Sequence, residues 1–133
     1  AGLNRLKMED IITAPISTDE MLPAVAQGAI GIERREKDIK VATMLEAIHN
    51  STTGLLLSAE RAFLEALDGS CETPIAGLAE FKNEHLRFRG EILKTDGSEV
   101  YSDEQVVSKE DATFVGIEMA HKLLSQAGND FFS

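Results

Sequence analysis

The chain has one cysteine, Cys71, no tryptophan, and no apolar run near the roughly 20 residues that a membrane-spanning helix needs. A single cysteine cannot form an internal disulfide, which favours a reducing compartment. The sequence also has neither a basic amphipathic leader nor an apolar secretory core. We therefore expect a cytoplasmic protein with no membrane partner; the composition is also compatible with a plastid stroma.

Positive charge is scarce as well. The 133 residues include 13 Lys and Arg against 23 Asp and Glu, a net charge of −10 at pH 7. Nucleic-acid binding requires clustered basic residues, so we expect no nucleic-acid partner. The three histidines, His49, His85 and His121, are not spaced as metal ligands, and no CxxC or HExxH motif occurs. We expect no metal site.

The pattern over residues 51–133 predicts an α+β domain. Apolar residues at helical spacing predict a helix over residues 52–67, with Asn50 or Ser51 as its N-cap and Gly69 at the left-handed position after its end. Alternation from residue 75, with turns at 82–85 and 96–97, predicts three antiparallel strands. Ser108 and Asp111 resemble a capping box that opens a last helix. We expect a three-stranded antiparallel sheet with helices on one face.

The first 48 residues do not form a comparable unit. They contain a helix end at residues 1–6, a candidate strand at residues 29–34 and a short helix over residues 38–48. An isolated strand is not stable, so this one would need partners that the sequence does not contain.

Cys71 lies in the loop LDGSCETP, directly after a predicted helix. The negative end of that helix, together with Asp68 and Glu72, would raise the pKa of the thiol above its usual value. Cys71 is therefore not arranged like a protease nucleophile. Two readings remain: an incidental loop cysteine, or an exposed attachment point for a covalent group on a loop that turns at Ser70 and is stiffened by Pro74.

Other polar and small residues carry weaker signals. Gln27 and Gly28 could allow close approach of a ligand, or simply form a tight crossover. The adjacent arginines at 34 and 35 could bind carboxylates, but acidic neighbours favour a solvated charge run. Glu60 and Arg61, in the middle of a predicted helix, are expected to form structural pairs.

Two stretches, LPAVAQGAIGIE at residues 22–33 and ERAFLEALDGSCETPIA at residues 60–76, together resemble the hydroxymethylbilane synthase (porphobilinogen deaminase) family. The opening AGLNRL is similar to the same family just upstream. The resemblance extends over essentially the whole chain in the expected order. It is weaker from residue 80 onward, where only Asp96-Gly97-Ser98 and the final helix match.

This resemblance implies a transferase of tetrapyrrole biosynthesis that condenses four porphobilinogen molecules into hydroxymethylbilane with release of ammonia. Its primer would be a dipyrromethane cofactor, joined to Cys71 by a thioether, with Ser70 on the same loop. Gln27 and Gly28 would lie at the hinge side of the cleft, and Gln27 could contact the pyrrole chain. The family's catalytic aspartate belongs to an N-terminal region that this sequence lacks, so no catalytic residue is assigned here.

The resemblance also implies a domain division. Residues 1–28 would end a second doubly wound α/β domain, residues 29–50 would return to a first, and residues 51–133 would form the cofactor-carrying domain. The chain would then be a C-terminal fragment, inactive alone, of a protein that is a monomer when complete. The alternative is a non-catalytic α+β ligand-binding or interaction module in which Cys71 is incidental.

Overall fold

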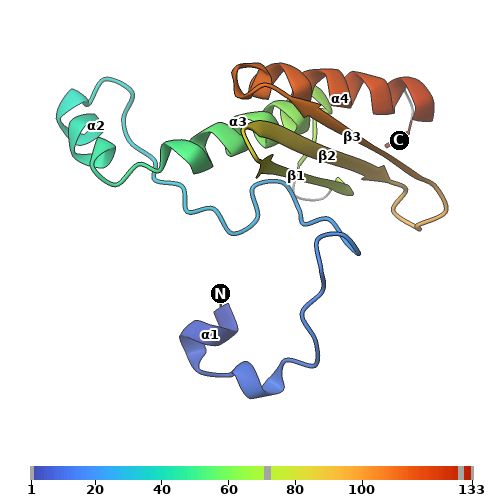
Figure 1. Cartoon of the computed structure of the whole chain (residues 1–133), viewed down its shortest axis with the longest axis horizontal. Helices are drawn as coiled ribbons and strands as arrows, with labels where there is room; N and C mark the ends of the chain where they lie inside the picture. The colour runs from blue at the N-terminus through green and yellow to red at the C-terminus, as the bar shows by residue number, and fades with distance from the viewer. Residues whose placement is uncertain (1, 71–72, 129–130, 133) are drawn as a thin grey trace.

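A computed structural model describes residues 2–70, 73–128 and 131–132. A three-stranded sheet and two long helices form its packed part (Figure 1). The elements follow the chain in the order α1 (Gly2–Leu6), η1 (Glu9–Ile11), α2 (Ile39–Glu46), α3 (Ser51–Ala66), β1 (Ile75–Lys82), β2 (His85–Leu93), β3 (Val100–Val107), η2 (Lys109–Asp111) and α4 (Ala112–Ala127).

Helix α3 begins and ends with local hydrogen bonds. At its start, the side chain of Asn50 accepts a hydrogen bond from the backbone N–H of Thr53 at 2.9 Å, which confirms Asn50 as the N-cap. At its end, Asp68 takes the left-handed conformation, with φ of 51°, in place of Gly69. The N–H of Gly69 donates to the carbonyl of Leu64, as in a Schellman motif. The prediction that Gly69 occupies the left-handed position after this helix is therefore wrong.

Gly69 instead lies close to two neighbouring side chains. A Cβ at this position would come within 2.6 Å of the Cδ1 atoms of both Leu64 and Ile75. A larger residue at position 69 would force the ends of these two side chains to shift.

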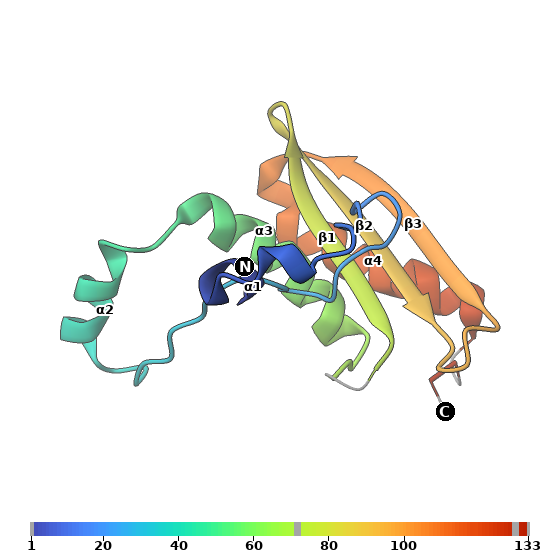
Figure 2. The same ribbon diagram turned by 90° about the horizontal axis from the view of Figure 1, so that it is seen from below.

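The strands form an antiparallel meander in the order β1-β2-β3, as the alternating pattern predicts. Ile75 pairs with Ile92 and Gly77 with Gly90, while Ile92 also pairs with Tyr101 on the third strand. This register places Ile75, Ala79, Phe88 and Ile92 on one face with Tyr101, whereas Leu78, Val100 and Val106 lie on the other. Both α3 and α4 cover the first of these faces, and Figure 2 shows the opposite, open face in front of them.

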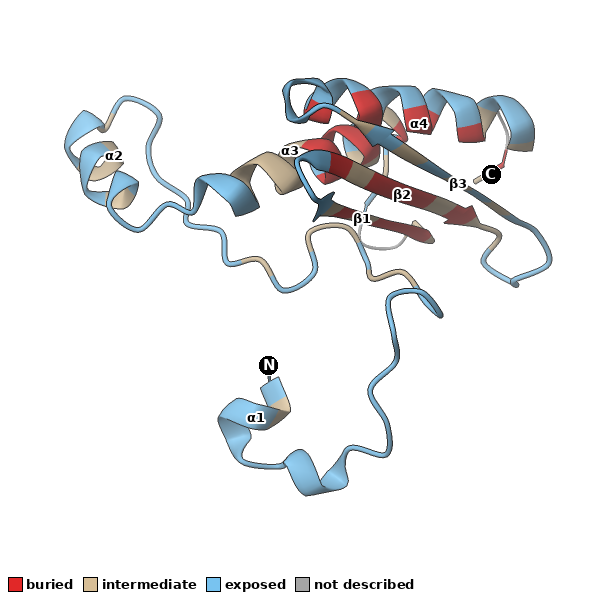
Figure 3. Ribbon diagram, viewed as in Figure 1, coloured by how far each residue is buried: buried red, intermediate tan, exposed pale blue. Residues whose placement is uncertain are grey.

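The core lies between the two helices and the covered face of the sheet, where the buried residues gather in Figure 3. Phe63 of α3 and Phe88 of β2 are fully buried and pack edge to face, with ring centroids 5.3 Å apart. On α4 the inward-facing residues Val115, Met119 and Leu123 are all fully buried. The expected α+β fold with helices on one face is confirmed.

The start of α4 differs from its predicted capping box. The Ser108 hydroxyl donates to the carboxylate of Asp111 at 2.8 Å, and neither side chain caps a backbone N–H. A turn of 3-10 helix, η2, precedes α4 instead.

The first part of the chain is largely exposed (Figures 1 and 3). Helix α2 forms as predicted, with the Asp38 side chain accepting from the N–H of Val41. The strand expected at residues 29–34 does not form, since no neighbouring strand offers its hydrogen bonds there. Ile30 is accordingly 93% exposed. The expected division of the chain at residues 28 and 50 stays a prediction.

One front segment does pack on the sheet, and we call residues 18–26 the strap. Its first half crosses the open face near Arg89, and its second half runs along the free edge of β1 (Figure 2). Ala24 forms an antiparallel bridge with Ala76, and the N–H of Gly77 donates to the carbonyl of Pro23 at 3.1 Å. The strap thus gives an edge strand some of the partners that its exposed backbone lacks.

Candidate functional site

The loop between α3 and β1 is the first candidate site. Cys71, the expected attachment point, and Glu72 lie outside the described residues, and so does the predicted pKa shift of the thiol. Ser70 is exposed, and its N–H donates to the Thr73 hydroxyl at 3.0 Å. The Thr73 N–H donates in turn to the Ser70 carbonyl at 3.2 Å. These bonds join the two described ends of the loop.

A hollow of about 250 Å³ lies beside this loop. Its lining comes from the loop, the end of β2 and the C-terminal tail, and consists of Ser70, Thr73, Pro74, Leu93, Lys94, Thr95, Phe131 and Phe132. The Lys94 ammonium lies 5.0 Å from the centre of the buried Phe131 ring, a cation–π distance. Among the described residues that line the hollow, Lys94 alone is charged. The described lining therefore combines two aromatic rings with one positive charge.

Phe131 is held in place by a second aromatic contact. Its ring packs edge to face on Tyr101 of β3, with centroids 5.5 Å apart. The hydroxyl of Tyr101 donates to Glu99 at 3.1 Å, and this hydrogen bond is the main cause that raises the pKa of Tyr101. Sequence periodicity gave no sign that Lys94, Tyr101 and Phe131 lie together, because they come from separate parts of the chain.

The second candidate site is the turn that carries Gln27 and Gly28. Ala26 and Gly28 both have positive φ, 60° and 83°, and Gln27 between them is exposed. The strap holds this turn at the edge of β1, whereas Ser70 lies before the strand begins. Neither Gln27 nor Gly28 lines the hollow beside Ser70. Among the described residues, Ser70 and the Gln27–Gly28 turn therefore do not share this hollow.

Glu60 is the polar residue whose environment differs most from expectation. Its side chain does not pair with Arg61, which is exposed, and the residue itself is only 6% exposed. Its two carboxylate oxygens accept backbone N–H groups, from Ala26 at 2.7 Å and from Ala79 at 2.9 Å. One sequence signal was available: Glu60 falls on the apolar stripe with Leu56 and Phe63, where a carboxylate must find buried donors.

The open face of the sheet carries a network of charges. Arg89 is 8% exposed and donates to the carbonyl of Thr18 and to the carboxylates of Asp19 and Glu80, all within 2.9 Å. Arg87 binds Glu104 through two hydrogen bonds, and these lower the pKa of Glu104. The network fixes the strap to β2, and within it the buried Nε of Arg89 has no hydrogen-bond partner among the described residues.

Two classes of site find no support in the described parts of the chain. No group of three His, Cys, Asp or Glu side chains there is arranged to hold a metal ion. None of the helices described has both the length and the apolar character needed to cross a membrane.

Comparison with known sequences decides the family. The model of the porphobilinogen deaminase C-terminal domain matches residues 55–125, more than half of the chain. The chain belongs to the porphobilinogen deaminase family. A second model, of the dipyrromethane cofactor binding domain of porphobilinogen deaminase, matches residues 1–43. The resemblance read from residues 22–33 and 60–76 is thus confirmed.

Individual relatives match over the full chain. A porphobilinogen deaminase of Paracoccus denitrificans is 52% identical over 99% of the chain, and one of Nitrobacter winogradskyi is 45% identical over all of it. A chloroplastic porphobilinogen deaminase of Pisum sativum is 46% identical, again over the whole chain. The chain spans 42% of the length of the two bacterial relatives and 37% of the pea protein.

The family matches bear on the cofactor more than on its point of attachment. A dipyrromethane cofactor belongs to the family by the description of the second model, yet that model covers residues 1–43. Cys71 falls within the match to the C-terminal domain. The assignment of Cys71, Ser70, Gln27 and Gly28 to cofactor binding stays a prediction.

Proposed function

We propose that this chain is the part of a hydroxymethylbilane synthase that carries the dipyrromethane cofactor on Cys71. The whole protein would condense four porphobilinogen molecules head to tail, releasing four ammonia molecules, and water would free the linear product. The observation that carries this proposal is the family match over residues 1–43 and 55–125. The active cleft would be completed by N-terminal domains of the same protein.

The chemistry of the loop is consistent with a covalent cofactor. In the attachment step, the Cys71 sulfur would bond to the methylene carbon of an aminomethylpyrrole. The carbon–nitrogen bond would break, and ammonia would leave with the thiol proton. A sulfur that reacts once needs exposure and a fixed position more than a lowered pKa. When bound, the cofactor supplies the pyrrole carbon on which the chain grows.

The described residues around the loop fit such a group in part. The hollow of about 250 Å³ borders Ser70 and is lined by aromatic rings with one ammonium, that of Lys94. That ammonium could pair with a single carboxylate. A dipyrromethane with several acid side chains needs further cations, and these would come from the domains that complete the cleft.

The experiment is an intact-mass measurement on the whole protein that contains this chain, with Cys71→Ser as the matched variant. We expect the unsubstituted protein to exceed its sequence mass by two linked pyrroles, located by peptide fragmentation on Cys71. The Cys71→Ser protein should have no adduct and no turnover of porphobilinogen. An unmodified Cys71 in a protein that makes hydroxymethylbilane would refute the proposal.

Family membership disfavours the alternative of a binding module with an incidental cysteine. Two finer assignments remain part of the proposal: a cytoplasmic or plastid location, and a monomeric complete protein. Size-exclusion chromatography of the complete protein tests the second. Turnover of porphobilinogen by residues 1–133 alone would contradict the need for further domains.

A further inference from the structure

Helix α3 connects two regions that the proposed function assigns to the pyrrole chain. Its C-terminal end leads into the loop that contains Cys71, and Glu60 in its middle binds the turn that contains Gln27. Glu60 and Ala66, the last residue of the helix, are about 9 Å apart along the axis at 1.5 Å per residue. One rigid element therefore sets the spacing of the two regions.

Burying Glu60 costs more free energy than burying an apolar residue at the same position would cost. A carboxylate that is 6% exposed loses hydration, and none of the ion pairs formed among the described residues includes it. The compensation comes from two charge-assisted hydrogen bonds to backbone N–H groups, at 2.7 and 2.9 Å. One donor, Ala79, belongs to the free edge of β1, and the other, Ala26, belongs to the strap.

The bond to Ala26 constrains the turn most directly. Ala26 has a φ of 60°, which is unfavourable for a residue with a Cβ, and the turn continues through Gly28 at 83°. The Glu60 carboxylate accepts a hydrogen bond from the N–H of this strained residue. This bond fixes the direction in which the chain turns away from the edge of β1 at Gln27. An apolar residue at position 60 would fill the same space without fixing that direction.

We propose that Glu60 is a positioning residue for pyrrole-chain elongation, a role that rests on the proposed function. Through Ala26 it fixes the Gln27–Gly28 turn relative to the helix that ends at the Cys71 loop. Glu60 itself does not touch the reacting atoms. Its loss should therefore impair the addition of successive pyrroles and leave cofactor attachment intact.

The test uses the whole protein with Glu60→Gln, and Glu65→Gln as the control. Glu65 lies on the same helix, is exposed and undergoes the same change of charge. Gln at position 60 keeps one acceptor but turns an NH₂ group toward a backbone N–H. We expect a normal dipyrromethane mass on Glu60→Gln, a roughly tenfold lower kcat, and accumulation of protein bearing one to three added pyrroles in single-turnover mass spectra. Glu65→Gln should match the unsubstituted protein.

Gln27→Ala keeps the inference testable if Glu60→Gln fails to fold, because the exposed Gln27 side chain is not needed for packing. It should cause the same accumulation of partly extended chains without a lower melting temperature. An unchanged distribution of intermediates in Gln27→Ala or in a folded Glu60→Gln would overturn the inference. Absence of any pyrrole on Cys71 in the unsubstituted protein would instead refute the proposed function itself.

Discussion

Gly116 of α4 and Ala59 of α3 bring the two helices into backbone contact. A Cβ on Gly116 would lie 2.2 Å from the Ala59 carbonyl oxygen and 2.9 Å from the Phe63 nitrogen. No side chain can move aside to relieve these contacts, because both involve backbone atoms. The close crossing is what allows both helices to lie on one small sheet.

Gly116→Ala is therefore expected to destabilise the chain by about 2 kcal/mol, since overpacking outweighs the gain of about 1 kcal/mol in helix propensity. Urea unfolding of the 133-residue chain measures this change. Gly54→Ala in α3 is the control, because its new Cβ would meet only the movable His49 ring, at 2.9 Å. Equal effects of the two substitutions would contradict the proposed backbone contact.

Arg89 fixes the strap to the open face of the sheet, so Arg89→Lys should release it. A lysine keeps the charge but cannot bond Thr18, Asp19 and Glu80 at once. If the substitution lowers the free energy that holds the strap on the sheet by about 1–2 kcal/mol, the population of molecules with a detached strap becomes roughly 5- to 30-fold larger. Cleavage after Glu20 by a glutamate-specific protease should accelerate by that factor.

Arg87→Lys serves as the control for this experiment. Arg87 lies on the same strand but pairs with Glu104 and Glu80, within the sheet. Its substitution should leave cleavage after Glu20 unchanged. Equal acceleration in both variants would show that the strap depends on the sheet as a whole.

The elements that the sequence predicted well are those determined by local signals. Helical spacing and Asn50 placed α3 at residues 52–67, within one residue of its observed ends. The Asp96-Gly97 turn is observed with Gly97 at a φ of 73°. The strand expected at residues 29–34 was wrong, because strand formation depends on a neighbour and this chain offers none there.

The candidate site was less predictable for the same reason. The single cysteine and the loop around it were visible in the sequence, but the hollow formed with Lys94 and Phe131 depends on tertiary contacts. Glu60 appeared as one acid in a helix, and only the folded strap shows which N–H groups its carboxylate receives. Helical periodicity shows that Glu60 lies on the apolar stripe, but it cannot show which distant residues supply the donors.

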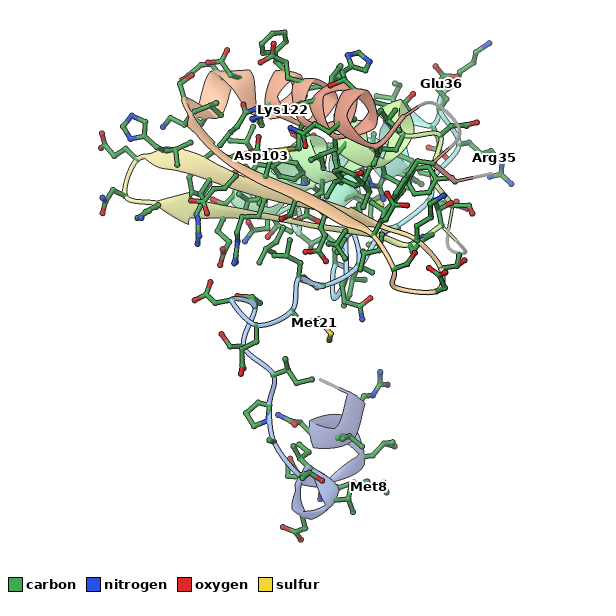
Figure 4. The ribbon with its side chains drawn as sticks, turned by 90° about the vertical axis from the view of Figure 1, so that its right-hand side faces the viewer. Met8, Met21, Arg35, Glu36, Asp103 and Lys122 are labelled. Carbon is green, nitrogen blue, oxygen red and sulfur yellow. The ribbon has the colours of Figure 1, made fainter. Side chains whose placement is uncertain are left out.

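The lowered pKa of Asp103 on β3 predicts that the stability of the chain depends on pH. Burial alone would raise the pKa of Asp103, but its bond from Lys122 of α4 and a backbone bond from Glu104 outweigh it, so the net pKa is lowered. Figure 4 shows the two side chains where β3 faces α4. A lowered carboxylate pKa contributes stability that is full above about pH 4 and is lost as the pH falls through the folded-state value.

Asp103→Asn should therefore lose less stability than the unsubstituted chain between pH 5 and pH 3, a range set by the ordinary Asp pKa of about 3.9. Urea midpoints measured across this range test the prediction. Glu118→Gln on the exposed side of α4 provides a matched loss of one acid. If both variants follow the same pH profile, the Asp103–Lys122 pair contributes nothing to acid sensitivity.

Gly28 offers a test of the strained turn that needs no change in packing. Its φ is 83°, and a Cβ there would have no atom within 4 Å, so Gly28→Ala carries a backbone cost alone, about 1 kcal/mol. Gly31→Ala also places its Cβ in open space, but at a residue without positive φ. If Glu60 holds the turn through Ala26, hydrogen exchange of the Ala26 amide should be about fivefold faster in Gly28→Ala and unchanged in Gly31→Ala. Equal rates in the two variants would mean that the positive φ of Gly28 does not strain the turn, and that the conformation of residues 26–28 follows from the strap alone.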